Sequence, residues 1–385
     1  MYKRILDLSL SSRESCFLWG PRQTGKSTLL AQLFPNATYY DLLLSDVFQR
    51  LVTNPALIRE ECDAAGLTGE NQKAPVIIDE VQKIPALLDE VHWLIEHRRL
   101  RFVLCGSSAR KLKRSHANLL GGRAVRYELF PLVFPEIDNF DLVRAINFGL
   151  LPRHYAADTP QRLIQSYVGE YLQQEITAES LTRNVPAFGR FLEIAALCNG
   201  EMLNYKNIAS DCGVSAPTVK EYYQILEDTL IGSQLPAYQK RAQRRTISAP
   251  KFYFFDVGIT GFLAKRGVVR QGSELFGRAF EHVIYNEILA HSRYSEKYYP
   301  VTYWKTTSGF EVDFVLADHE TVIEVKSSSE AKPRHLKGLR AFKEEFKVKN
   351  ALVVSLDPQP RKTEDNILIM PWKAFLKKLW GDEII

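Results

Sequence analysis

Short apolar runs that alternate with helical segments are the feature that most restricts how this chain can fold. Four such runs occur early in the chain, namely CFLW (16–19), ATYYDLLL (37–44), PVIIDE (75–80) and RFVLCG (101–106). Helical patterns lie between them, at 27–34 and 86–97. Strands that alternate with helices form parallel sheets, and runs that are apolar throughout are buried on both faces. The pattern therefore predicts an α/β fold with a parallel sheet covered by helices.

The pattern changes twice further along the chain. Residues 160–235 are almost wholly helical, and a strand-like KFYFFD follows at 251–256. From about residue 275 a helix, two alternating strands, another helix and the apolar run ALVVSL follow one another. A chain of 385 residues is too long for one ordinary core. We expect three domains, an α/β core at 1–150, a helical domain at 151–265 and an α/β domain at 266–385.

Composition restricts the cellular location more than the function. No apolar run reaches the roughly 18 residues of a membrane span, and the N-terminus lacks the apolar core of a signal peptide. The five cysteines are scattered and form no CxxC pair, which favours free thiols in a reducing compartment. We therefore expect a cytoplasmic protein without a membrane partner. The net charge of +5 is too small to indicate nucleic-acid binding by itself.

The segment GPRQTGKS (20–27) fits the pattern G-x-x-x-x-G-K-[ST] and lies between a predicted strand and a predicted helix. Gly20 and Gly25 let the loop turn its amides toward phosphates, and the helix N-terminus adds further donors. Lys26 is predicted to supply charge to the terminal phosphates, and the Ser27 hydroxyl can ligate magnesium. We predict binding of ATP with Mg²⁺. The expected nucleotide contacts are Gly20, Pro21, Arg22, Gln23, Thr24, Gly25, Lys26, Ser27, Thr28 and Ser107.

Polar residues after the next strands complete the predicted site. Asp79 and Glu80 end the strand VIID, so Asp79 is predicted to hold magnesium and Glu80 to polarise the attacking water. Ser107 follows the strand FVLCG, where a polar residue can sense the γ-phosphate. Arg123 is the candidate arginine finger, with a surface role as the equal alternative. The run Arg110, Lys111, Lys113 and Arg114 is typical of a solvated basic loop.

Four segments in this order, GPRQTGKSTLL, VIIDEVQKIP, GSSARKL and LLGGRAVRYELFPLVFPE, resemble a prokaryotic group of AAA-superfamily ATPases. The resemblance covers nearly the whole chain. It implies an AAA-type core with a helical lid and an uncharacterised C-terminal domain. It also implies that Lys26, Ser27, Asp79, Glu80 and a serine at 107 or 108 carry the nucleotide chemistry.

Residues 205–228 have the rhythm of a helix-turn-helix. Gly213 permits the turn, Ser215 can cap the second helix, and apolar residues at helical spacing give that helix a core face. Those residues are Val219, Tyr222, Tyr223 and Leu226. The strand 251–256 would close a wing, and the basic segment KRAQRR (240–245) would contact phosphates. The second helix is itself acidic, so a protein-contact role is equally open.

Two alternating strands at 311–316 and 322–326 contain an acidic pattern. Glu324 and Lys326 share one face of the second strand, and Asp313 shares a face with Glu311, opposite Val312 and Phe314. A hairpin would bring these groups together, and Glu281 lies on a preceding helix. The alternative is a solvated strand face, where alternating acids and lysines are common.

This pattern resembles the PD-(D/E)XK nuclease fold. The resemblance implies that Glu281, Asp313 and Glu324 hold magnesium and that Lys326 positions water or stabilises charge at the phosphate. The sequence departs from that pattern in having Val312, not proline, before Asp313.

Two functions remain open. The first is an ATPase, assembled as a homo-oligomer, that couples its nucleotide state to a nuclease-like domain acting on DNA or RNA. The alternative is a switch without nuclease activity, in which ATP regulates DNA or protein contacts. A peptide-handling machine has less support, because no substrate-pore aromatic motif is evident.

Overall fold

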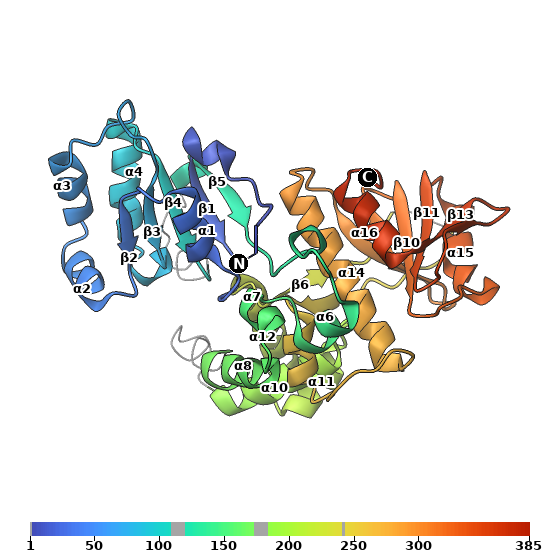
Figure 1. The fold of residues 1–385 in the computed structure, drawn as a ribbon. Helices are drawn as coiled ribbons and strands as arrows, with labels where there is room; N and C mark the ends of the chain where they lie inside the picture. Colours follow the sequence, from blue (N-terminus) through green and yellow to red (C-terminus); the bar gives the residue numbers. More distant parts are fainter. Residues whose placement is uncertain (1, 109–119, 173–183, 241–242) are drawn as a thin grey trace. The chain divides into compact units, whose positions relative to one another are not determined.

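The computed structural model describes residues 2–108, 120–172, 184–240 and 243–385. The chain divides into two compact units. The smaller unit comprises residues 4–131 and 228–231, and the larger comprises 1–3, 132–227 and 232–385. Figure 1 shows that both units combine helices with a sheet.

The smaller unit contains the predicted parallel sheet. Its strands are β1 (Ser15–Trp19), β2 (Tyr39–Asp41), β3 (Val76–Asp79), β4 (Phe102–Gly106) and β5 (Ala124–Glu128). They are ordered β2-β3-β4-β1-β5, and every neighbouring pair is parallel. All residues of β1, β3 and β4 are buried, as the continuous apolar runs predict. The fold class predicted from the sequence is confirmed here.

Helices cover this sheet and bury the apolar side chains of β1, β3 and β4. They are α1 (Lys26–Leu33), α2 (Ser45–Thr53), α3 (Leu57–Ala64) and α4 (Leu87–Arg98), with 3₁₀ turns at Ser9–Ser12, Val81–Lys83 and Leu120–Gly122. The core includes Phe17 and Trp19, whose rings stack with centroids 5.3 Å apart. The sheet therefore forms the rigid base from which the loops after β1, β3 and β4 project.

The helical part of the larger unit precedes its main sheet. Its helices are α6 (Leu142–Phe148), α7 (Pro152–Ala156), α8 (Pro160–Ser166), α10 (Val185–Leu197), α11 (Tyr205–Cys212), α12 (Ala216–Asp228) and α13 (Val257–Leu263), with a 3₁₀ turn at Phe134–Glu136 and a π-helical stretch at Tyr167–Leu172. Strand β6 (Gly232–Leu235) pairs antiparallel with β7 (Lys251–Phe254). The run 251–256 thus forms a strand, as predicted, that ends two residues earlier.

The C-terminal part forms a second, mixed sheet between two layers of helices. Its strands are β8 (Val301–Lys305), β9 (Glu311–Leu316), β10 (Thr321–Lys326), β11 (Asn350–Ser355), β12 (Arg361–Lys362) and β13 (Ile367–Pro371), in the order β12-β13-β11-β10-β9-β8. Apolar residues of α14 (Glu274–Tyr294) and α16 (Trp372–Trp380) pack with one face. Those of α15 (Lys337–Glu345), which follows a 3₁₀ turn at Pro333–Leu336, pack with the other.

One expectation about β9 is wrong. Val312 and Phe314 were expected on the same face of the strand, but they belong to different apolar clusters. The cause is an irregularity between β8 and β9, where Thr302 pairs with Val315 but Trp304 pairs with Val312. Two residues of β8 therefore span three of β9, and such a bulge reverses the alternation of side chains. Asp313 lies within this bulge.

Candidate functional site

Two glycines determine the conformation of the loop after β1. A Cβ atom on Gly20 would lie 2.5 Å from the carbonyl oxygen of Leu129, closer than real Cβ atoms approach backbone. Gly25 has φ of 92°, in the left-handed region, and directly precedes α1. Arg4 fixes the loop from outside, since its guanidinium donates to the Thr24 carbonyl at 2.6 Å and to the Phe130 carbonyl at 2.7 Å.

Lys26 lies inside this loop and is buried. Its Nζ donates to the carbonyl oxygens of Gly20 at 2.7 Å and Pro21 at 3.0 Å. The ammonium group is therefore held at the mouth of the loop by the same backbone that would surround a phosphate. Thr24 closes the loop internally, with its hydroxyl donating to the Pro21 carbonyl at 2.8 Å.

The predicted magnesium ligands lie side by side. The Ser27 hydroxyl donates to Asp79 Oδ2 at 2.6 Å, and the Tyr39 hydroxyl donates to the same oxygen at 2.6 Å. Burial, helped by the hydrogen bond to Asp79, raises the pKa of the Tyr39 hydroxyl, which remains a donor. The prediction from sequence did not include Tyr39. The sequence did contain a signal for Tyr39, namely a hydroxyl-bearing residue in the predicted strand that precedes the one ending in Asp79.

Glu80 adopts a left-handed backbone conformation with φ of 59° and is buried. Burial raises the pKa of its carboxyl, while the Arg22 and Lys26 charges act in the opposite direction. Gln82 Nε2 donates to Glu80 Oε2 at 2.5 Å and to Ser107 Oγ at 3.2 Å. Gln82 thus links the candidate base to the candidate phosphate sensor, and the analysis of the sequence missed it.

Arg123 lies at the opposite end of the strands from the P-loop. The register pairs Ser15 with Ala124 and Trp19 with Glu128, so Arg123 precedes the end of β5 remote from the loop. Ser15 and Trp19 are four residues apart on β1, which corresponds to about 13 Å along the strand. Its guanidinium forms an exposed ion pair with Glu96. Arg123 therefore does not reach the P-loop of its own chain. A finger role stays a prediction for a neighbouring subunit only, and the exposed ion pair agrees with the alternative, a surface role. The basic loop containing Arg110, Lys111, Lys113 and Arg114 lies outside the described residues.

The helix-turn-helix segment has the expected local geometry. Gly213 ends α11 with φ of 68°, and the Ser215 hydroxyl accepts from the Thr218 amide at 3.3 Å. The expected core face of α12 is buried. The basic segment after β6 is partly neutralised, because Lys240 pairs with Asp318 at 2.8 Å and Arg244 pairs with Glu345 at 2.8 Å. Residues 241 and 242 lie outside the described part.

Within the larger unit, the structure brings Glu281, Asp313, Glu324 and Lys326 together in a cavity of about 270 Å³, which we call the acidic cavity. It is lined by Asn199, Gly200, Glu201, Met202, Lys251, Arg278, Glu281, Lys305, Glu311, Asp313, Glu324 and Lys326. The prediction that α14, β9 and β10 supply neighbouring acidic groups thus agrees with the geometry. Lys251 and the segment 199–202, which come from the helical part, were not predicted from the sequence.

Asp313 and Glu324 share Lys326. Its Nζ lies 2.6 Å from Glu324 Oε1 and 3.7 Å from Asp313 Oδ2, and Asp313 Oδ2 also accepts from the Val325 amide at 2.7 Å. Burial and the adjacent Asp313 charge raise the pKa of the Glu324 carboxyl well above its usual range. Although burial acts to lower it, Asp313 and Glu324 raise the pKa of the Lys326 ammonium.

A second set of groups surrounds Glu311 and Glu281. Lys251 Nζ lies 2.9 Å from Glu311 Oε1 and 3.4 Å from Glu281 Oε1, and Lys305 Nζ lies 2.7 Å from Glu311 Oε2. The Tyr253 hydroxyl also donates to Glu281. Although burial acts to raise it, Lys251 and Lys305 lower the pKa of Glu311 to about 2.

The donor set of the acidic cavity fits a hard cation such as Mg²⁺, which prefers oxygen ligands. One observation supports this fit directly. Glu324 is only 7% exposed, and its buried Oε2 has no hydrogen-bond partner among the described residues. An unpaired buried carboxylate oxygen is costly unless a ligand satisfies it. Across the described residues, no three His, Cys, Asp or Glu side chains are already arranged as a metal-binding group.

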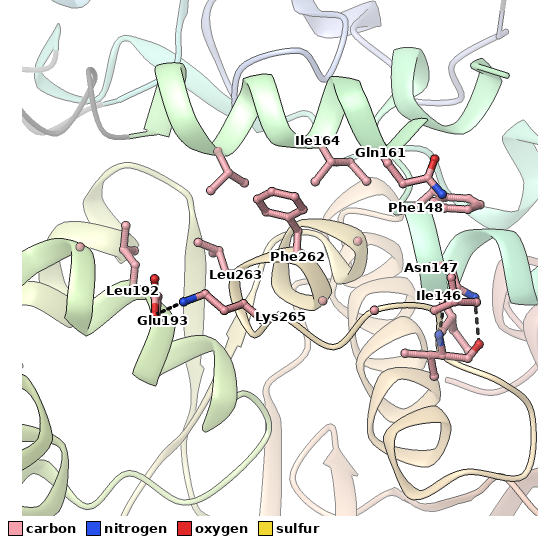
Figure 2. Close-up of a pocket in the computed structure, with 17 residues that line it drawn as sticks. Ile146, Asn147, Phe148, Gln161, Ile164, Leu192, Glu193, Phe262, Leu263 and Lys265 are labelled. Atoms are coloured by element: carbon pink, nitrogen blue, oxygen red, sulfur yellow. Dashed lines mark hydrogen bonds and ion pairs between the residues drawn. The ribbon is translucent and has the colours of Figure 1, made fainter. Parts of the chain in front are cut away.

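A larger cavity of about 450 Å³ lies among α6, α8, α10 and α13. Figure 2 shows Ile164 and Phe262 directed toward one another across it. The charged groups at its edge, Lys265 and Glu193, pair with each other at 2.8 Å. The cavity contains none of the predicted site residues.

Three family models match consecutive parts of the chain. Residues 12–138 match an AAA domain, residues 139–268 a domain of unknown function (DUF8612) and residues 276–375 a domain of unknown function (DUF4143). The boundaries at 139 and 276 differ from those expected at 151 and 266. No described helix combines the length and apolar character needed to cross a membrane.

Similar proteins span nearly the whole chain. The uncharacterized protein MJ1637 of Methanocaldococcus jannaschii is 23% identical, over 94% of this chain and 85% of that protein. The uncharacterized protein Rv2008c of Mycobacterium tuberculosis is 22% identical, over 96% and 82%.

Two solved structures are weakly similar. The ORC1 protein of Aeropyrum pernix in complex with DNA has a TM-score of 0.27 and 12% identity, over 67% of this chain and 89% of that chain. A STAND protein with a tetratricopeptide repeat sensor from Pyrococcus horikoshii has a TM-score of 0.22 and 16% identity, over 75% and 47%. Similarity at these TM-scores supports no argument about this chain. The match of residues 12–138 supports similarity to AAA-type ATPases.

Proposed function

We propose that this protein is a Mg²⁺-dependent, AAA-type ATPase whose nucleotide state acts on a nuclease-type site in its C-terminal part. The observation that supports ATPase activity is the hydrogen bond of 2.6 Å between the Ser27 hydroxyl and Asp79, beside a loop that encloses Lys26. A hydroxyl and a carboxylate at this position are the ligands with which P-loop enzymes hold Mg²⁺.

The chain's own residues account for the remaining chemistry. Bound magnesium would neutralise charge on the phosphates. The loop amides and Lys26 bind the phosphates, and Glu80 accepts the proton of the attacking water. The raised pKa of Glu80 makes it a better proton acceptor than an exposed glutamate. Gln82 holds the Glu80 carboxylate next to Ser107, so proton transfer and phosphate sensing involve one hydrogen-bonded group.

Lys26→Ala tests the ATPase. The variant removes the buried ammonium group that the loop carbonyls hold in place, so we expect nucleotide binding or turnover to be lost, by on the order of 100-fold or more. Binding of a fluorescent ATP analogue and phosphate release measure the two steps. ATPase activity equal to that of the unmodified protein would exclude this loop as the catalytic site.

For the acidic cavity we propose metal-dependent cleavage of DNA or RNA. The unpartnered Glu324 Oε2 next to Asp313 and Lys326 carries this proposal. The carboxylates of the acidic cavity would hold Mg²⁺, and Lys326 would stabilise negative charge at the phosphate. The alternative is a binding platform without cleavage, which the pairing of each lysine with a carboxylate also supports.

One assay separates the two. DNA and RNA are incubated with the protein and Mg²⁺ or Mn²⁺, with and without ATP. Cleavage that is lost in Asp313→Ala and Lys326→Ala supports the nuclease. Intact substrate in every condition, with bound nucleic acid that responds to ATP, supports the switch.

The proposal includes assembly. Arg123 lies at the end of the strands opposite its own loop, so it can serve as an arginine finger only in a neighbouring subunit. We therefore propose a homo-oligomer. Three functional regions, at 1–150, 151–265 and 266–385, and a cytoplasmic location also remain part of the proposal.

A further inference from the structure

Lys251 is a charged group of the acidic cavity that does not belong to the C-terminal sheet. It comes from β7, next to the helical part, and only 4% of its surface is exposed. Lysine is almost never buried to this extent unless it is paired, because its charge loses water. Here Nζ pairs with Glu311 Oε1 at 2.9 Å and Glu281 Oε1 at 3.4 Å, and it lies 5.2 Å from the centre of the Tyr303 ring.

The carboxylates of the cavity differ in what already satisfies them. Glu281 is held by Lys251 and by the Tyr253 hydroxyl, and Glu311 is held by Lys251 and Lys305. Glu324, by contrast, has a buried oxygen without a hydrogen-bond partner in the part of the chain that the structure describes, and Asp313 lies 3.7 Å from the Lys326 that pairs with Glu324. The carboxylates that are available to bind a cation are therefore those of Asp313 and Glu324, and not that of Glu281.

The charges in the cavity also indicate that it binds a single divalent cation. Four carboxylates and three ammonium groups line it, apart from Arg278 and Glu201, which pair with each other at 2.7 Å. A single divalent cation more than balances the remaining negative charge. A second divalent cation that needs carboxylate ligands would have to displace Lys251 from Glu281 and Glu311, since the remaining carboxylate, Glu201, is paired with Arg278.

We infer that Lys251 is a fixed cation of this site, which holds Glu281 and Glu311 so that Asp313 and Glu324 bind a single divalent metal ion. The inference rests on the proposed nuclease-type function and deepens it. Lys251 takes the place that a second metal ion would occupy, and Glu281 is a positioning residue for Lys251 instead of a metal ligand. The helical part thereby supplies an essential residue of the cavity.

The test is the stoichiometry of Mn²⁺ binding, measured by calorimetry and by the Mn²⁺ spin-resonance signal on the full chain. All variants carry Asp79→Asn, which removes the predicted magnesium-binding carboxylate of the nucleotide site. The parent protein, which carries Asp79→Asn alone, should bind one Mn²⁺ ion. Glu324→Gln and Asp313→Asn should weaken this binding by at least about tenfold, whereas Glu281→Gln should leave it within about twofold. Lys251→Met should bind two.

Lys305→Met is the matched control, because Lys305 pairs with Glu311 but not with Glu281; it should still bind one ion. If Lys251→Met does not fold, the Glu281→Gln result decides by itself. Loss of Mn²⁺ in Glu281→Gln, or one ion in a folded Lys251→Met, overturns the inference and leaves the nuclease proposal intact. A parent protein that binds no Mn²⁺ overturns both.

Discussion

The nucleotide loop and the acidic cavity are assembled from the chain in different ways. The loop site takes its groups from residues 20–27 and from the ends of β3 and β4, and backbone atoms hold Lys26 in place. The cavity takes its groups from residues as far apart as 199 and 326, and side-chain ion pairs hold them. The first site depends on a local conformation. The second depends on the packing of several elements, so it should be more sensitive to change elsewhere.

The largest effect should come from Glu80→Gln. The amide preserves the shape of the side chain but cannot accept a proton, so ATP turnover should fall by on the order of 100-fold or more. Nucleotide affinity should change little, because Glu80 is not expected to bind the phosphates. Phosphate release and equilibrium binding of an ATP analogue measure the two quantities. Turnover within about threefold of the unmodified protein would show that another group is the base.

Two glycines allow the contrast between the sites to be tested by steric means. Alanine at Gly20 would place Cβ 2.5 Å from Leu129 O, and alanine at Gly338 would place it 1.7 Å from Glu311 O. Each should destabilise its unit by on the order of 1–3 kcal/mol. Gly20→Ala should impair only nucleotide binding and Gly338→Ala only metal binding. Urea unfolding and the two binding assays measure these effects.

Gly189→Ala is the control for both variants. Gly189 lies inside α10, and no heavy atom of the described residues would lie within 4 Å of its added Cβ. Alanine there should stabilise the protein by about 0.5–1 kcal/mol, since it favours helix. If Gly20→Ala also impaired metal binding, the two sites would not be independent.

A smaller, pH-dependent effect is expected in the larger unit. His282 is fully buried between Phe254 and Asn199, and burial lowers its pKa to about 4. The unfolded chain therefore binds a proton more readily than the folded one between about pH 6.5 and 4. The stability contributed by neutral His282 is present above this range and is lost as the pH falls through it.

His282→Gln removes this titration and can still donate to the Phe254 carbonyl. Between pH 6.5 and 4 the unmodified protein should lose on the order of 2 kcal/mol more stability than the variant. Urea unfolding at several pH values measures this difference. Parallel curves for the two proteins would contradict the assignment of a neutral, buried imidazole.

The same contrast explains how much the sequence could reveal. The P-loop was predictable because its function requires glycines, a lysine and a serine at a fixed local spacing. The hairpin of Asp313, Glu324 and Lys326 was predictable because alternation places residues on strand faces. Lys251 was not, since nothing local in KFYFFD indicates that one strand of the helical part reaches the C-terminal acids.

Irregular features of the fold also could not be predicted from the sequence patterns. The bulge around Asp313 depends on pairing with β8, so the alternation of β9 alone could not predict it. Arginine at position 123 has the side chain that an arginine finger requires, but the register of β5 against β1 places this residue away from the loop, and the sequence does not give that register. β5 itself, AVRYE, was not predicted because polar residues interrupt its apolar pattern.

The smallest effect concerns the basic segment after β6, where neighbouring arginines differ. The Arg244 guanidinium is paired with Glu344 and Glu345, whereas Arg245 is exposed and has no ion pair among the described residues. If this segment contacts phosphates, Arg245→Ala should reduce the salt dependence of nucleic-acid binding by about one phosphate contact. Arg244→Ala should leave affinity within about twofold, because its charge is already neutralised. Fluorescence anisotropy at several salt concentrations measures both, and a stronger loss in Arg244→Ala would show that nucleic acid competes with the glutamates for this arginine.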